Sequence, residues 1–147
     1  ITGGRMELTK LFVDYGIIGF LIFMSIVSLS IAIERFLTYR KIKIGDFTVK
    51  KSLELVLTSK IHLIATIGSN APYIGLLGTV LGIMFTFYNM GEEGYMETGK
   101  IMIGLALALK ATAIGLLVAI PSVALHNFIL RKAKVLLMEW EIENDGR

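Results

Sequence analysis

The chain has 147 residues, of which 54% are hydrophobic and 18% are charged, and its net charge at pH 7 is +3. A soluble domain usually contains about 25% charged residues. Here the charges gather between long apolar runs, which excludes a soluble enzyme domain. Because the sequence contains no cysteine, a disulfide framework, a thiol nucleophile and a zinc–thiolate site are excluded as well.

Three apolar runs are each long enough to cross a bilayer, which takes roughly 20 mostly apolar residues in a helix. In chain order, the predicted spans are residues 15–33, 61–90 and 101–130. The fold class is therefore an all-α, three-span membrane protein. As helices, the second and third runs would each be about 45 Å long, whereas the hydrocarbon core is about 30 Å thick. We expect their excess length to extend into the cytoplasm.

Charge divides the segments outside the spans into two kinds. Segment 34–60 carries seven basic residues and three acids, whereas segment 91–100 carries three acids and one base. Basic residues collect in the cytoplasmic loops of membrane proteins. We therefore expect 34–60 and the tail 131–147 to be cytoplasmic. The N-terminal segment 1–14 and the loop 91–100 are expected on the periplasmic side.

Short stretches outside the spans also carry helix signals. Residues 46–60 have apolar side chains at roughly helical spacing with lysines between them, which predicts a helix on the membrane surface or on the protruding helix ends. The tail 133–144 is predicted to be helical as well. At the N-terminus, one interpretation takes Met6 as the native start and residues 1–5 as an addition to the native chain; the sequence leaves this open.

The second and third spans each carry a stripe of small residues. Helices in lipid associate through close packing of small side chains and through interhelical hydrogen bonds. The stripe residues are Gly75, Gly78, Thr79, Gly82 and Thr86 in the second span, and Gly104, Ala108, Ala111, Thr112, Gly115, Ala119 and Ser122 in the third. Two interpretations stay open: the stripes hold the two spans together in one hairpin, or they hold an oligomer together.

Thr79 and Thr112 are expected at the same depth on antiparallel neighbours. Measured from outer ends at Asn89 and Ile101, they lie about 15 Å and about 16.5 Å deep, near the middle of the bilayer. One interpretation is that these threonines only make interhelical hydrogen bonds. The other is that several copies around an axis present them as a polar ring on a proton path.

Lys110 is a charge inside the third span, about 13.5 Å from its outer end. An intramembrane charge marks a candidate functional site. None of the three predicted spans contains Asp or Glu. If the protein moves protons through the membrane, the titrating acid must therefore come from another subunit.

Motifs for catalysis, metal binding or cofactor binding are missing from the sequence. His62 and His126 have no second ligand nearby, so we expect neither a metal site nor a cofactor. The glycine-rich stretch 75–82 lacks the Lys-Ser/Thr of a phosphate loop, and no nucleophile–base set points to an enzyme. Pro72 and Pro121 lie within the long runs, where each can kink its helix.

Two segments resemble the signatures of a known family. Residues 65–84, ATIGSNAPYIGLLGTVLGIM, resemble the second-span signature of the ExbB/TolQ family, and residues 110–127, KATAIGLLVAIPSVALHN, resemble its third-span signature. The overall similarity is greatest to the short ExbB form. The positions that match the family's motifs are Pro72, Gly75, Gly78, Thr79, Gly82, Thr112, Gly115, Pro121 and Asn127, together with Glu34 and Arg35, which match the charged pair that closes the first span.

The resemblance implies a homo-pentameric ring in the bacterial inner membrane, lined by the second and third spans. It implies a single-span partner of the ExbD or TolR type inside the ring, with a membrane Asp near Thr79 and Thr112. Proton flow past this Asp would drive work on a TonB-type or TolA-type protein. ExbB-like and TolQ-like roles share these motifs, and a passive membrane scaffold is the alternative of another class.

Two positions depart from the family pattern. Many members carry Glu where this chain has Leu107, and Lys110 stands where many members have an apolar residue. We expect Lys110 to pair with an acid of an adjacent subunit or with a bound lipid; the alternative is a neutral or snorkelled lysine at a subunit boundary. Segment 35–60 is also shorter than in many members, so some cytoplasmic accessory contacts are expected to be missing.

Overall fold

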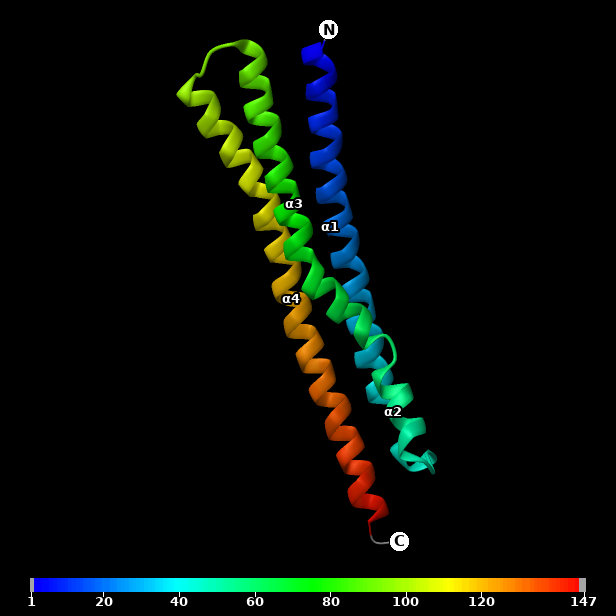
Figure 1. Cartoon of the computed structure of the whole chain (residues 1–147). Helices are drawn as coiled ribbons and strands as arrows, with labels where there is room; N and C mark the ends of the chain where they lie inside the picture. The colour runs from blue at the N-terminus through cyan, green and yellow to red at the C-terminus, as the bar shows by residue number, and fades with distance from the viewer. Residues whose placement is uncertain (1, 146–147) are drawn as a thin grey trace.

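The chain folds into three long helices and two short ones. The computed structural model describes residues 2–145, with the elements α1 (Thr2–Lys41), the 3-10 helix η1 (Ile44–Asp46), α2 (Lys50–Thr58), α3 (Ile61–Glu93) and α4 (Thr98–Asn144). α3 and α4 form an antiparallel hairpin, and α1 lies alongside it (Figure 1). α1, α3 and α4 are each long and apolar enough to cross a membrane. The all-α architecture with three candidate spans is thus confirmed for the described residues.

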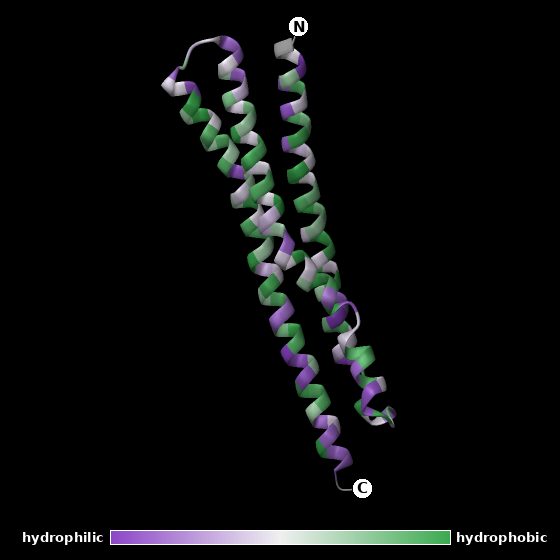
Figure 2. Cartoon of the chain, viewed as in Figure 1, coloured by the Kyte–Doolittle hydropathy of each residue, from purple (hydrophilic) through white to green (hydrophobic). Residues whose placement is uncertain are grey.

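The surface of the long helices is apolar over most of their length. Figure 2 shows hydrophobic residues along the middle of all three, with hydrophilic residues gathered toward the ends. Phe12 exposes 81% and Leu117 exposes 70% of its surface. Side chains of this kind are stable outside the helix contacts only when lipid or other protein covers them.

Two predicted elements differ in extent from the structure. The helix expected within 46–60 is present as α2 and is shorter, because η1 and an extended residue at Val49 precede it. The helical tail expected at 133–144 is the continuation of α4, which runs through Pro121 without a break. Residues 1 and 146–147, at the ends of segments 1–5 and 131–147, lie outside the described residues.

The backbones of α3 and α4 are in direct contact. A Cβ atom added at Gly75 would lie 2.7 Å from the carbonyl oxygen of Ala111, and one added at Gly115 would lie 2.8 Å from the carbonyl oxygen of Ala71. One added at Gly82 would lie 2.8 Å from the Cβ of Ala108. The two small-residue stripes therefore pack against each other within one chain.

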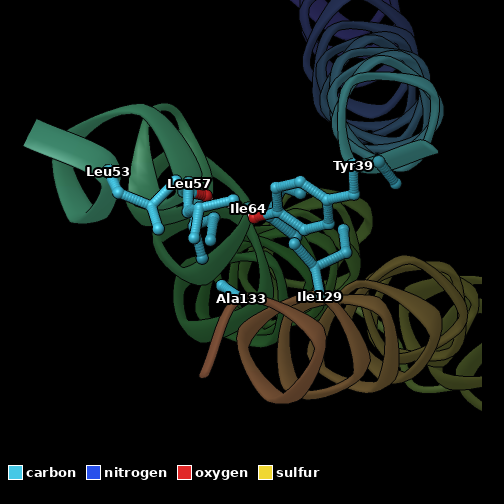
Figure 3. Packing of buried hydrophobic residues seen from close by; sticks show 8 residues of the cluster. Tyr39, Leu53, Leu57, Ile64, Ile129 and Ala133 are labelled. Atoms are coloured by element: carbon cyan, nitrogen blue, oxygen red, sulfur yellow. Dashed lines mark hydrogen bonds between the residues drawn. The ribbon is translucent and has the colours of Figure 1, made fainter. Parts of the chain in front are cut away.

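Two hydrophobic clusters join α1 to the hairpin. The first consists of Leu21, Met24, Ile67, Ala71, Val118 and Ala119. The second, whose packing Figure 3 shows, consists of Ala32, Tyr39, Leu53, Leu57, Ile61, Ile64, Ile129 and Ala133. The buried members of both clusters on α1 begin at Leu21, with half-buried Ile17 packed against the first cluster, and none of residues 4–20 is buried. α1 is therefore packed tightly along its second half and loosely along its first.

Arg35 fastens α2 to α1 at the end of the molecule where α2 lies, called here the α2 end. Its Nε and Nη2 atoms donate to the two carboxylate oxygens of Glu34 at 2.8 and 2.7 Å, and its Nη1 atom donates to the carbonyl of Val56 at 2.7 Å. Arg35 is only 5% exposed. The Tyr39 hydroxyl donates to the carbonyl of Leu57 nearby.

α4 is fastened to the same end by two further contacts. The Trp140 Nε1 atom donates to the carbonyl of Phe47 at 2.9 Å. Lys50 forms an ion pair with Glu141, and the hydrogen bond that its ammonium group donates to this carboxylate raises the pKa of Lys50 above its ordinary value. The α2 end therefore ties together all three long helices. At the opposite end, where residues 94–97 join α3 to α4 (the turn end), Lys100 of α4 pairs with Glu93 of α3 at 3.2 Å, but among the described residues no hydrogen bond or ion pair joins α1 to the hairpin there.

The glycine contacts lead to a first prediction. Gly115→Ala should destabilise the protein by about 1–3 kcal/mol, because the new methyl group would overlap the backbone of α3 and force the helices apart. The thermal midpoint of the detergent-purified protein measures this effect. Gly19→Ala is the matched control, since a Cβ there meets nothing within 4 Å. Equal midpoints for the two variants would contradict the backbone contact.

The contacts of Arg35 lead to a second prediction. Arg35→Lys should release α2, because an ammonium group cannot reproduce the planar fork that binds Glu34 and Val56 together. A hydrogen bond to a charged group contributes about 1.5–3 kcal/mol, so the locally opened state should be at least about tenfold more populated. Limited proteolysis by trypsin at Lys50, the first residue of α2, and at Lys60, just after α2, should accelerate accordingly.

Arg40→Lys is the control for this experiment. The guanidinium of Arg40 lies 5.1 Å from the centre of the Phe36 ring, and an ammonium group keeps such a cation–π contact. Its cleavage rate should stay unchanged. Equal rates for the two variants would show that Arg35 does not hold α2 in place.

Candidate functional site

Two threonine hydroxyls meet between α3 and α4. The hydroxyl of Thr79 is hydrogen bonded to the hydroxyl of Thr112 and lies 2.9 Å from the carbonyl oxygen of Ala108. Thr79 is only 6% exposed, and Thr112 is half-buried. The structure thus brings together the two residues that the sequence placed at matched depth.

The helix contact around this pair holds the two hydroxyls at short range. An added Cβ at Gly75 would lie 3.2 Å from the Cα of Thr112, so no side chain separates the helices there. The hydroxyl oxygen of Thr79 lies 3.4 Å from the carbonyl oxygen of Gly75 in its own helix. This is farther than the 2.9 Å to the carbonyl oxygen of Ala108 in α4. Thr79 is therefore oriented mainly toward α4.

The hydroxyl pair can act both as donor and as acceptor. Each threonine has one O–H donor and two acceptor lone pairs. When Thr79 donates to Ala108 and Thr112 donates to Thr79, the oxygen of Thr112 can still accept a hydrogen bond from outside the hairpin. When Thr79 donates to Thr112 instead, the proton of Thr112 is available to an external acceptor. The pair can therefore bind a carboxyl group in either protonation state.

Lys110 lies away from the threonine pair. Its side chain is exposed and lines a cavity of about 390 Å³ between α1 and the hairpin. Glu7, Lys10 and Asp14 of α1 line the same cavity. Lys110 and Thr112 are two positions apart on a helix, so they face different sides.

The acids in this cavity are residues that sequence reasoning missed. Counting apolar residues placed Asp14 just outside the first span, and no role was assigned to Glu7. A signal was present, because Glu7, Lys10 and Asp14 follow the i, i+3, i+7 spacing that puts side chains on one helix face. Residue spacing does not show which part of the hairpin this face contacts, because that depends on how α1 packs against it.

The comparisons with known proteins identify the family. Residues 45–142 match the MotA/TolQ/ExbB proton channel family. The chain is 57% identical over 136 residues to "Biopolymer transport protein ExbB" of Aquifex aeolicus, an alignment that covers 92% of each chain. It is 53% identical over 133 residues to "Putative biopolymer transport protein ExbB-like 2" of Helicobacter pylori, covering 90% of this chain and 89% of the relative. The chain belongs to the MotA/TolQ/ExbB family.

Membership of this family and the three apolar helices make the chain a multi-pass membrane protein. The relatives named ExbB that match over nearly their whole length confirm the resemblance to the short ExbB form. The family match begins at residue 45, so the charged face of α1 lies outside it. The threonine pair lies inside it.

The remaining glycines of the family motifs lie along the helix contacts. Gly75, Gly82 and Gly115 lie between α3 and α4, as described above. A Cβ added at Gly78 would lie 2.6 Å from the Cβ of Ala111 and 3.2 Å from the side chain of Ile17 on α1. Gly78 is therefore where all three long helices come together.

The other motif residues do not join the threonine pair. Pro72 lies inside α3 and is half-buried, whereas Pro121 lies inside α4 and is exposed. Asn127 is exposed, with its side-chain oxygen 3.4 Å from Nδ1 of His126. Glu34 and Arg35 lie at the α2 end. In residues 2–145, no group of three or more His, Cys, Asp or Glu side chains could hold a metal ion.

Proposed function

We propose that this protein is the ring-forming subunit of a proton-driven motor in the bacterial inner membrane. In this proposal five copies surround an axis lined by α3 and α4, and an ExbD-type single-span partner inside the ring supplies a membrane Asp. Proton flow past that Asp energises TonB-dependent transport across the outer membrane through a TonB-type protein. The match to a proton channel family and the relatives named ExbB support this assignment.

The observation that carries the proposal is a hydroxyl pair with no carboxylate along the apolar length of its two helices. Thr79 and Thr112 form a polar site in an apolar hairpin, yet residues 61–91 and 101–138 contain no Asp or Glu. A hydroxyl pair alone has no group that titrates in the physiological range. It can, however, donate to an ionised carboxylate and accept from a protonated one. The acid that the site is suited to bind must then come from a partner.

The exposed faces of the hairpin support assembly into a ring. Large apolar side chains on these faces are left uncovered by α1 and α2, and they include Tyr73, Leu76, Val80, Phe87, Leu109, Leu116 and Ile120. In a membrane protein such faces meet lipid or other helices. A ring of copies would cover one side of the hairpin with its neighbour and would leave the other side to the axis.

The proposed orientation follows from the charges at the two ends. Segment 34–60, which contains α2, carries seven basic residues, and the end of α4 adds Arg131, Lys132 and Lys134. We place this α2 end in the cytoplasm by the positive-inside rule. The turn end and the N-terminus are then periplasmic, and the bilayer surrounds residues 15–33, 61–90 and 101–130. Names of relatives favour an ExbB-like over a TolQ-like role.

Removal of either hydroxyl tests the proposed function. Thr79→Val and Thr112→Val keep the branched shape of the side chain but remove the O–H group. Each should lower TonB-dependent uptake in cells by about tenfold or more, because proton transfer loses a positioned hydroxyl. The ring should stay intact, since an interhelical hydrogen bond in a membrane contributes only about 0.6 kcal/mol.

Thr86→Val is the matched control, because Thr86 is equally buried but donates only to the carbonyl of Gly82 in its own helix. Its uptake should equal that of the unmodified protein. Native mass spectrometry of each purified complex should show five copies with the single-span partner. Full uptake by both test variants, with the ring intact, would favour a passive scaffold instead.

A further inference from the structure

The cavity that holds Lys110 is called here the α1 crevice. It lies between the first half of α1 and the hairpin, and four charged residues line it: Glu7, Lys10 and Asp14 from α1, and Lys110 from α4. Its other lining residues are mostly apolar. The crevice therefore concentrates charge in an otherwise apolar part of the molecule.

The α1 crevice is closed on the side that faces the α2 end. Gly78 of α3 is in close contact with both Ala111 of α4 and Ile17 of α1. Beyond this point, toward the α2 end, the buried cluster that starts at Leu21 fills the space between the helices. The charged residues thus lie on the turn-end side of a tight three-helix contact.

Toward the turn end the crevice continues into further cavities. One of about 260 Å³ shares Glu7, Lys10 and Leu107 with it and extends to Asn89 and Lys100. Another, of about 290 Å³, shares Glu7 and Asn89 with the second and extends to Glu92. Neighbouring cavities with charged and polar linings therefore lie between Lys110 and the turn end.

Asp14 and Lys110 differ by only about 3 Å in their distance along the bundle from the contact at Gly78. Ile17 and Ala111 both contact Gly78. Asp14 is three residues from Ile17 toward the turn end, or about 4.5 Å along α1, and Lys110 is one residue from Ala111 in the same direction. The two side chains thus face one cavity within a single helical turn of each other, and lysine has a long flexible stem with which to reach a partner.

Charge balance points to α1 as the source of the counter-ion. Within residues 61–91 and 101–130 of the hairpin, Lys110 is the only Asp, Glu, Lys or Arg. The α1 face carries Glu7, Lys10 and Asp14, which sum to one negative charge, and Lys110 makes the lining neutral. An unpaired ammonium at this depth is costly, and the acid available deepest in the crevice is Asp14.

We propose that Asp14 is the counter-ion of Lys110 and that this pair fixes the first half of α1 against the hairpin. The charged groups of Asp14 and Lys110 are more than 4 Å apart in the structure, so the pair forms when the flexible lysine stem turns toward Asp14 within the same chain, inside the crevice that both residues line. It replaces the expected partner from an adjacent subunit or a lipid. Because none of residues 4–20 is buried, this electrostatic contact stabilises a part of α1 that apolar packing holds only weakly.

Charge reversal in the purified complex tests the pair. Asp14→Lys and Lys110→Asp should each lower the thermal midpoint by about 5 °C or more, because each leaves like charges facing each other in the crevice. The double reversal should restore most of the loss. Glu7→Lys combined with Lys110→Asp is the control, and it should restore less. A double reversal no more stable than the sum of the single losses, or equal rescue by the control, would overturn the assignment.

Cross-linking in the native membrane separates an intrachain pair from one between copies. Because the sequence contains no cysteine, the double variant Asp14→Cys, Lys110→Cys can be treated with a short bis-maleimide without background reaction. After trypsin cleavage within 34–60, an α1 fragment joined to an α4 fragment in a monomeric product is expected. Cross-linked dimers without the monomeric product would overturn the proposal.

Phe12→Cys combined with Lys110→Cys is the matched control for the cross-link. Phe12 is 81% exposed and does not line the crevice. This control should give no intrachain product. An intrachain product of equal yield would show that α1 rotates freely against the hairpin, which would also overturn the proposal.

Discussion

The contact between Gly75 of α3 and Gly115 of α4 determines how close the two helices of the hairpin lie. With glycine on both sides, the Cα atom of each residue lies within about 3 Å of where a side chain of the other would begin. Only this spacing allows the hydroxyl of Thr79 to reach both the hydroxyl of Thr112 and the carbonyl of Ala108. The polar site of the hairpin is therefore a consequence of residues that have no side chain.

The same spacing explains where the larger polar groups lie. No lysine or carboxylate fits into an interface of this kind, so Lys110 projects to the side, toward α1. α1 packs on the hairpin through apolar residues from Ile17 onward and leaves a polar crevice before that point. The chain thus keeps two polar features apart: an uncharged hydroxyl pair inside the hairpin and a charged cavity outside it.

Much of the architecture could be predicted from composition alone. Long uncharged runs can form only spanning helices in a bilayer, because every backbone group must be satisfied within the segment. The meeting of Thr79 and Thr112 could also be predicted, since rise per residue fixes depth along two antiparallel helices. Both inferences depend on properties within a helix or a simple hairpin.

The residues around Lys110 could not be assigned in this way. The apolar run of α1 begins at Tyr15, which suggests that Asp14 lies at a membrane surface. In the structure Ile17 packs at Gly78, and this places Asp14 in the lining of the same cavity as Lys110. The offset of α1 along the hairpin is a tertiary property that comes from the fit of its apolar residues into the second half of the bundle. The bounds of α2 could not be predicted from spacing either. They depend on contacts from distant parts of the chain, because Arg35 binds the carbonyl of Val56 in α2 and Trp140 binds that of Phe47 just before it.

The clamp at the α2 end has a mechanical consequence. Arg35 and Tyr39 join α1 to α2 there, and Trp140 joins α4 to Phe47 just before α2, all through side-chain-to-carbonyl bonds. Near the turn, by contrast, a cavity lies between α1 and the hairpin. The bundle is therefore stiffer at the α2 end than at the turn end. A force applied to it would move α1 relative to the hairpin most at the turn end.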